Sequence, residues 1–341
     1  MQHFKTSFGR LASVAAFATT LSASAAWAEE LVLSSWLPPQ HPVVTGVIEP
    51  WAAQVAEVTD GRVTVRILPR PMGPPPAHFD LAADGDADIV YGLHSFTRDN
   101  RFLRSGIGQF SFLGDNAVAT SQAYWNVYTE TLDAAAEHEG THLLSLWVHG
   151  PGMFHNNQRA IETAADFEGL KIRVPGGYIS EMIEALGATT QFMGPGDVFE
   201  RLSTGVIDGV TFPVEALRAF NLGPHLTNTM TVPGGLYNTS WFMVMNEDKW
   251  ADLSAQDQAA INEISGAALA GIAGEVWNAA DAGGLEAANE AGVVIAPAND
   301  AVLAVITDYA ASAEAAWAEE LDAQGFDGAA ALEDMRAQAA Q

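Results

Sequence analysis

Apolar positions along the chain alternate between a strand-like period of two and a helical period near 3.6. Strand-like runs fall at 31–36, 63–68, 87–91 and 142–148, and segments with helical character fall between them at 47–58, 79–83 and 122–139. An Ala-rich helix beginning after Ser254 is predicted to continue to about residue 280, because serine is a good N-cap. Such alternation favours a mainly parallel sheet with helices on both faces.

The segment 166–213 has the most regular pattern in the chain. Leu170, Ile172 and Val174 alternate with Lys171 and Arg173, which predicts a strand with one buried face. Helices are predicted near 179–186 and 196–206, so the unit is expected to be strand, helix, strand, helix, strand. Arg173 would then lie at the carboxyl end of a strand, where ligands collect in open α/β sheets. Its guanidinium could bind a carboxylate through two parallel hydrogen bonds, or it could pair with a nearby acid on the surface.

Composition narrows the possible functions. The chain has 341 residues, a 48% apolar fraction, no cysteine, and 15 basic against 42 acidic residues, which gives a formal net charge of −27. Disulfides, thiolate metal sites and cysteine nucleophiles are thereby excluded. A surface so acidic repels phosphates, so nucleic-acid binding is not expected.

The first 28 residues are predicted to be a signal peptide. Lys5 and Arg10 are part of a basic n-region, residues 11–21 form a short apolar stretch, and Ala26-Trp27-Ala28 fits an A-x-A cleavage site. The mature chain would begin near Glu29, and the protein would be periplasmic.

The residues of one enzyme motif are present in the sequence. His138, Glu139 and His142 match the H-E-x-x-H pattern of zinc hydrolases, whose two histidines must share one helix face. Gly140 interrupts the motif and a strand is predicted to follow it, so the two histidines are expected on different elements. A zinc-dependent hydrolase therefore stands only as the alternative function. No metal site or cofactor is expected.

Several blocks resemble one known family. DFEGLKIRVPGG (166–177), ALGATTQFMGPGDVF (185–199) and LSTGVIDG (202–209) are similar to the central blocks of DctP-type solute-binding proteins of tripartite ATP-independent periplasmic (TRAP) transporters. The resemblance implies an α/β, two-lobed periplasmic binding protein fold with a ligand cleft between the lobes and long C-terminal helices. The expected first lobe is 29–150 with about 238–285, and the second is 151–237 with about 286–341.

The resemblance also implies which residues contact the ligand. In this family the arginine of the KIRVP block, here Arg173, anchors the ligand's carboxylate. Met153 and Phe212 stand where many members have an arginine and an asparagine, which argues against a ligand that needs many polar contacts. Trp36, Tyr91 and Trp241 could complete an aromatic wall with Phe212, although each aromatic ring could instead belong to the core.

The expected function is capture of a small organic acid and its delivery to a TRAP membrane permease, without catalysis. The protein is expected to be a monomer. Carboxylates, sulfonates and zwitterions such as betaine-like or ectoine-like solutes remain open as ligands, because a zwitterion is least repelled by the acidic surface. A ligand-sensing subunit of the same fold is a further alternative.

Overall fold

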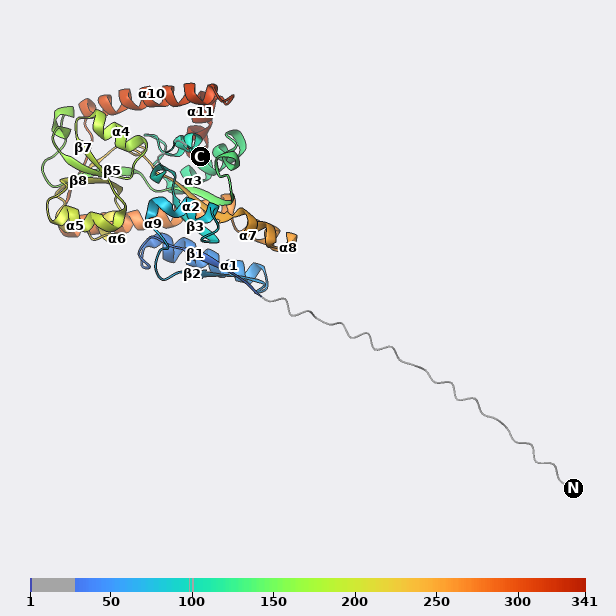
Figure 1. Cartoon of the computed structure of the whole chain (residues 1–341). Helices are drawn as coiled ribbons and strands as arrows, with labels where there is room; N and C mark the ends of the chain where they lie inside the picture. Colours follow the sequence, from blue (N-terminus) through green and yellow to red (C-terminus); the bar gives the residue numbers. More distant parts are fainter. Residues whose placement is uncertain (2–27, 98, 100) are drawn as a thin grey trace.

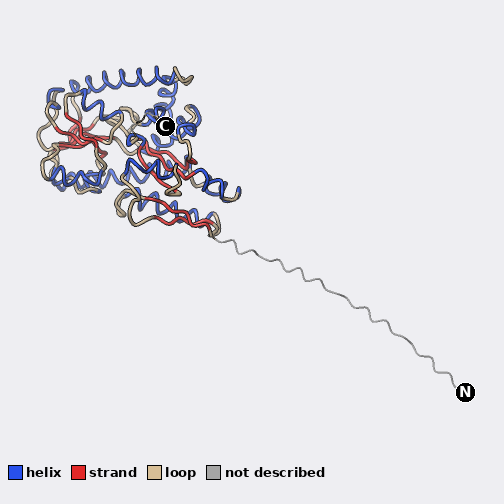
Figure 2. The backbone as a smooth tube through the Cα atoms, in the orientation of Figure 1, coloured by secondary structure: helices blue, strands red, loops and turns tan. Residues whose placement is uncertain are grey.

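The chain forms two separate sheets in the computed structural model, which describes residues 1, 28–97, 99 and 101–341 (Figures 1 and 2). The first sheet has the strand order β2-β1-β3-β10-β4. Its strands are β1 (Glu29–Ser34), β2 (Val63–Ile67), β3 (Ile89–Leu93), β4 (Thr141–Val148) and β10 (Ser240–Asn246). β1 is parallel to β2 and β3, whereas β10 is antiparallel to both β3 and β4.

The second sheet has the order β11-β9-β5-β8-β6-β7. It consists of β5 (Gly152–Asn156), β6 (Lys171–Val174), β7 (Thr189–Phe192), β8 (Gly209–Pro213), β9 (Asn228–Thr231) and β11 (Val294–Pro297). β6 is parallel to β7 and β8, and β5 is antiparallel to β8 and β9. The two sheets belong to two lobes, and the chain passes from the first to the second through 149–151 and returns through 232–239.

Short helices accompany each sheet. The first sheet is accompanied by α1 (Glu49–Val58), α2 (His78–Ala83), α3 (Ala117–Asn126), α7 (Glu247–Asp252) and α8 (Ala255–Glu263), and the second by α4 (Tyr178–Ala185), α5 (Val198–Ser203) and α6 (Ala216–Ala219). In α4 the residues Ile179, Met182 and Ile183 are buried on one face, as their spacing dictates. One buried apolar cluster belongs to the first lobe and one to the second, whereas a third contains residues of both sheets.

Three C-terminal helices connect the lobes. The long helix α9 (Gly266–Ala291) packs against α3 and β4 of the first lobe and against α6 of the second. The helix α10 (Asp300–Asp322) runs across the opposite side of the molecule in Figure 1, and α11 (Gly328–Ala339) packs against α3. The lobe boundaries stay a prediction. Because α11 packs against α3 and α10 against α4, the range 286–341 contacts the first lobe as well as the second.

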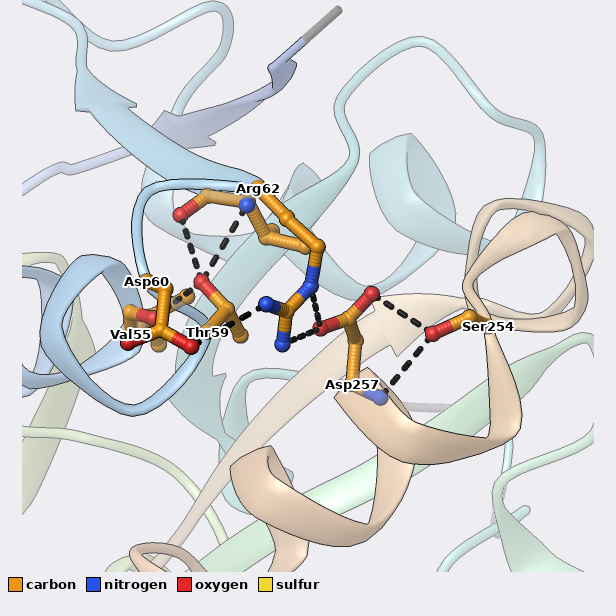
Figure 3. A network of polar contacts seen from close by, with 7 residues as sticks. Val55, Thr59, Asp60, Arg62, Ser254 and Asp257 are labelled. Carbon is orange, nitrogen blue, oxygen red and sulfur yellow. Dashed lines mark hydrogen bonds and ion pairs between the residues drawn. The ribbon is translucent and has the colours of Figure 1, made fainter. Parts of the chain in front are cut away.

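A polar network ties the turn between α1 and β2 to α8 (Figure 3). Arg62 Nε donates to Asp257 Oδ1 at 2.9 Å, and Arg62 Nη1 lies 3.2 Å from Asp60 Oδ2. Ser254 Oγ accepts the Asp257 backbone N–H, which confirms the predicted N-cap, and donates to Asp257 Oδ2 at 2.6 Å. Two carboxylates thus neutralise this arginine.

Three details of the sequence-based fold are wrong. The first sheet is mixed, because β10 returns antiparallel from the second lobe. The helix expected at 122–139 begins at Ala117 and ends at Thr131 after a π-helical turn, since Asp133 has the left-handed φ of 50°. The helix expected at 254–280 is two helices, α8 and α9, separated where Gly266 has φ of 56° and lies against Trp125.

The predicted signal peptide lies almost entirely outside the described residues. Within the part of the chain that the structure describes, no helix is long and apolar enough to cross a membrane.

Candidate functional site: an aromatic cavity around Arg173

A cavity lies between the two sheets. Its walls come from the carboxyl ends of β1, β3, β4, β6 and β8, from the amino end of the antiparallel β10, and from α9. The lining residues are Trp36, Leu37, His41, Leu93, Phe96, His149, Arg173, Pro175, Pro195, Phe212, Pro213, Glu215, Phe220, Tyr237, Thr239, Trp241 and Trp277. Because β10 is antiparallel, its start lies at the same sheet edge as the ends of its neighbours.

Arg173 is the only arginine or lysine on this lining. Its side chain is 1% exposed, its Nε donates to the Met193 carbonyl at 3.0 Å, and its Nη1 donates to the Thr211 carbonyl at 3.1 Å. Its Cζ lies 4.0 Å from the centre of the Phe212 ring, within cation–π range. Burial lowers the pKa of Arg173 to about 10, so the guanidinium stays charged at neutral pH.

Among the described residues, no carboxylate lies within ion-pair distance of Arg173. Its two hydrogen-bond acceptors are backbone carbonyls, which fix the plane of the guanidinium but bring no negative charge. A buried cation is costly unless an anion accompanies it. The charge of Arg173 is therefore not balanced by any described carboxylate within ion-pair distance.

Aromatic rings form the walls around this cation. Trp36 and Trp241 stack with ring centres 5.6 Å apart and planes 13° apart, and Phe96 meets Trp36 edge-on at 5.7 Å. On the other side, the rings of Phe212 and Phe220 lie 5.7 Å apart. A flat apolar ligand body would be enclosed on both faces by such walls.

Four of the six residues predicted to bind the ligand line the cavity, namely Trp36, Arg173, Phe212 and Trp241. Tyr91 lies behind the wall, where its hydroxyl bonds Ser35 Oγ at 2.6 Å and its carbonyl accepts the Trp36 indole N–H at 2.9 Å. It orients Trp36 rather than lining the cavity.

Met153, the sixth predicted residue, is likewise absent from the lining. It pairs with Phe212 across β5 and β8 and packs into the apolar cluster of the second lobe. The ligand-binding roles of all six residues remain proposals.

Several lining residues were not identified from the sequence. His149 and Phe96 follow the ends of β4 and β3, so the strand-end reasoning that identified Arg173 also applies to them. His41 lies in a loop and Trp277 in the middle of α9, and their places depend on how the lobes and this helix pack together. No local pattern in the sequence indicates such positions.

The lobes contact one another closely on one side of the cavity. Ser95 Oγ, from the first lobe, donates to the Pro175 carbonyl of the second at 3.2 Å. A Cβ on Gly176, whose φ is +87°, would lie only 2.5 Å from the Ser95 carbonyl oxygen. The Pro-Gly-Gly turn after β6 therefore allows an approach that other residues would block.

The residues of the H-E-x-x-H motif do not converge. His138 is buried and its Nε2 lies 3.0 Å from His94 Nε2, whereas His142 is in β4 and stacks on Trp250 with ring centres 3.7 Å apart. Among the described residues, no group of three or more His, Asp or Glu is placed to hold a metal ion. The geometry thus gives no support to the zinc-hydrolase alternative.

Two lobes that enclose a buried cation and aromatic rings in a cavity are the architecture of a solute-binding protein. The family model for bacterial extracellular solute-binding protein, family 7 (DctP), matches residues 33–320. The chain belongs to this family, which confirms the resemblance found in the sequence.

Known proteins resemble it over almost their whole length. The Outer membrane transporter protein TsaT of Comamonas testosteroni is 31% identical over 332 residues, which cover 97% of this chain and 98% of that protein. A TRAP periplasmic solute binding protein from Bordetella bronchiseptica, solved with bound (R)-mandelate and (S)-mandelate, is 38% identical with a TM-score of 0.88. The alignment covers 92% of this chain and 99% of that one.

A third relative comes from a marine metagenome. It is a TRAP solute binding protein specific for aromatic acid ligands, solved with metahydroxyphenylacetate, and it shares 31% identity with a TM-score of 0.83 over 92% of this chain and 98% of its own. Family and fold together are those of TRAP-type solute-binding proteins, and the predicted two-lobed α/β fold with long C-terminal helices is confirmed.

Proposed function

We propose that this protein captures an aromatic monocarboxylate in the cavity around Arg173 and delivers it to a TRAP membrane permease. The observation that carries the proposal is a buried arginine with no acidic partner among the described residues, set between aromatic walls. The guanidinium would hold the ligand's carboxylate with its unused N–H groups, since Nε and Nη1 already donate to backbone carbonyls.

Aromatic walls favour a flat ligand body over a flexible one. A ligand ring that stacks on side chains such as Trp36 or Phe212 gains more than the burial of its area alone provides. A rigid ring also loses little conformational entropy on binding. The ligands of the Bordetella and marine relatives, mandelate and metahydroxyphenylacetate, are of this chemical class. A small aliphatic zwitterion would leave much of the aromatic surface without contact.

The acidic surface does not oppose this choice. Fields from surface charges fade over about 8 Å at physiological ionic strength, whereas a buried contact between arginine and carboxylate is hardly screened. A monoanion also suffers less repulsion on approach than a dianion. The net charge of −27 therefore affects the approach of the ligand more than the bound state.

The proposal also covers export, oligomeric state and closure of the lobes. The protein would be exported by a signal peptide cleaved after Ala28, would act as a monomer, and would bind without catalysis. Domain closure about 149–151, 232–239 and α9 would trap the ligand, as hinge motions do in other two-lobed binding proteins.

A thermal-shift screen tests the proposed function. Aryl carboxylates such as mandelate, benzoate and 3-hydroxyphenylacetate would be compared with succinate, taurine, glycine betaine and ectoine at equal concentration. A ligand at 100 times its dissociation constant stabilises the folded state by about 2.7 kcal/mol. At equal concentration the tightest ligand gives the largest shift in melting temperature, and we expect it to be an aryl carboxylate. Stabilisation by ectoine or taurine with none by any aryl acid would contradict the proposal, as would stoichiometric zinc in the purified protein.

A further inference from the structure

Within the part of the chain that the structure describes, five buried polar side-chain atoms on the cavity lining have no hydrogen-bond partner. All five atoms belong to residues that line the cavity together with Arg173. They are His149 Nε2, Glu215 Oε2, Thr239 Oγ1, Trp241 Nε1 and Trp277 Nε1. Leaving a buried polar group unpaired costs free energy comparable to a lost hydrogen bond. Such a concentration of unpaired groups in one cavity indicates that a ligand supplies the missing partners.

Glu215 differs from the other four because it is an acid. It follows β8, its side chain is nearly inaccessible, and its own backbone N–H donates to Asp281 Oδ1 of α9 at 3.1 Å. No ion pair joins it to Arg173, even though both line the cavity. The nearest basic atom is His41 Nε2, 3.9 Å from Glu215 Oε1, which is too long for a hydrogen bond.

His41 does not neutralise Glu215. Its Nδ1 accepts the backbone N–H of Val43 at 3.2 Å, so the neutral ring carries its proton on Nε2, and burial lowers the pKa of His41 to about 3. Glu215 thus faces a neutral histidine from the loop after β1 and a second carboxyl group, Asp281, from α9. The hydroxyl of Tyr237 is a further titratable group near it, and burial raises the pKa of that hydroxyl.

A second carboxyl group nearby disfavours the ionised form of a buried acid, and so does burial itself. Burial, and after it the neighbouring Asp281, raise the pKa of Glu215 well above its usual range, and burial raises the pKa of Asp281 to about 7. In the protonated form, Glu215 presents an O–H donor and a carbonyl acceptor to the cavity. This is the chemistry that pairs with an alcohol or phenol.

We propose that Glu215 is a specificity-determining residue that recognises a hydroxyl group on the bound aryl carboxylate. The inference rests on the proposed function and deepens it: Arg173 holds the carboxylate, and the region of Glu215 and His41 binds an uncharged hydroxyl. The same region disfavours an aryl dicarboxylate, because a second carboxylate would lie against Glu215, whose neighbouring basic group, His41, is neutral. The ligand class is therefore a hydroxylated aryl monocarboxylate.

Calorimetric titration with matched ligand pairs tests this inference. The pairs are benzoate with 3-hydroxybenzoate, phenylacetate with mandelate, and phenylacetate with 3-hydroxyphenylacetate, and isophthalate serves as the dicarboxylate. In the wild type, at least one hydroxylated ligand should bind about tenfold more tightly than its parent, the size of one additional hydrogen bond. Isophthalate should bind more weakly than 3-hydroxybenzoate.

The readout in the variants is the ratio of the two dissociation constants in a pair. Glu215→Leu should reduce the preference for the hydroxyl to near unity, whereas Glu215→Gln, which keeps a donor and an acceptor, should retain part of it. Glu137→Gln is the matched control, because the Glu137 side chain is also largely buried and accepts a hydrogen bond from the Tyr128 hydroxyl at 2.6 Å, but it does not line the cavity. The control should leave the ratio unchanged.

The outcomes separate the two proposals. If aryl acids bind and depend on Arg173 but no hydroxylated ligand is preferred, the inference about Glu215 is wrong and the proposed function stands. A ratio that Glu215→Leu and Glu215→Gln both leave at the wild-type value would equally overturn it and assign Glu215 to joining β8 and α9. If no aryl acid binds at all, both proposals fail.

Discussion

Two arginines of this protein have opposite surroundings. Arg62 joins β2 to α8 and has two carboxylates, Asp60 and Asp257, within 3.2 Å. Arg173 is far more buried, yet its hydrogen-bond partners are the carbonyls of Met193 and Thr211. The hydrogen bond to Asp257 raises the pKa of Arg62, whereas burial lowers the pKa of Arg173.

The difference is informative because acids are abundant in this chain. With 42 acidic and 15 basic residues, a carboxylate is available for nearly any arginine. Arg62 has the surroundings of a structural residue, whose charge is balanced within the fold. For Arg173 no such balance exists among the described residues, and under the proposed function its counter-charge arrives with the ligand.

Giving Arg173 an internal acid would remove this difference and should have the largest effect. The centre of the Phe212 ring lies 4.0 Å from Arg173 Cζ. Phe212→Glu places a carboxylate at this position, so the new side chain should compete with the ligand's carboxylate for Arg173. Affinity for an aryl carboxylate should fall by at least roughly 100-fold, as expected when charge-assisted hydrogen bonds are lost. Titration calorimetry measures the loss.

Phe212→Gln is the control for this change, because it removes the ring without adding a charge. It should weaken binding less than Phe212→Glu does. Equal losses in the two variants would show that the aromatic ring, and not the missing acid, accounts for the effect.

The comparison also requires that the lobes close around Arg173. Gly176→Ala places a Cβ 2.5 Å from the Ser95 carbonyl oxygen at a φ of +87°, so the closed form should become less populated. Affinity should fall by roughly tenfold, in proportion to the lost closed fraction, without any change to a cavity side chain. Calorimetry with Gly205→Ala as the control, a positive-φ glycine with open space around it, isolates the effect of the contact.

A smaller effect should appear in the dependence of stability on pH. The network of Arg62 contains no histidine, whereas His149 lines the cavity and His155 donates to the Phe212 carbonyl behind it at 3.1 Å. Burial lowers the pKa of each histidine to about 4. The unfolded chain binds these protons below about pH 6.5, so their contribution to stability is lost as the pH falls from about 6.5 to 4.

The buried carboxyl groups work in the opposite direction over part of this range. Asp281, with its raised pKa of about 7, favours the folded state at low pH and loses that contribution as the pH rises. The histidines outnumber the carboxyl groups, because His41 and His138 are shifted downward as well. The melting temperature should therefore decrease as the pH is lowered from about 6.5 to 4, and His155→Gln should make this decrease less steep. An unchanged slope in that variant would mean that other groups cause the pH dependence.

The sequence predicted the parts of the fold and site that depend on local pattern. The alternating residues around Arg173 indicated a strand, and the turn that follows indicated its end, so the position of Arg173 near a strand end could be predicted without a structure. The same pattern could not show that β10 is antiparallel, because strand direction depends on where the chain returns from the second lobe. The helix break at Asp133 depends on one left-handed residue that is not a glycine, which propensity does not reveal.

The predicted aromatic wall illustrates the same limit. Trp36 and Trp241 line the cavity, whereas Tyr91 is turned behind them by its hydrogen bonds to Ser35 and Trp36. Glu215 was not predicted, because its significance lies in the absence of a cation nearby, and that can be judged only when the packing of His41 is known. A sequence shows which charges exist, but not which are left without a partner.

The most direct test is calorimetric titration of one aryl carboxylate into Arg173→Ala and Arg62→Ala under the same conditions. We expect Arg173→Ala to bind at least roughly 100-fold more weakly than wild type, with Arg173→Lys between them because lysine keeps the charge and loses the planar fork. Arg62→Ala should melt at a lower temperature yet bind within about threefold of wild type, since distant sites act independently. If folded Arg173→Ala binds within a few-fold of wild type, the buried arginine does not hold the ligand and the central claim is wrong.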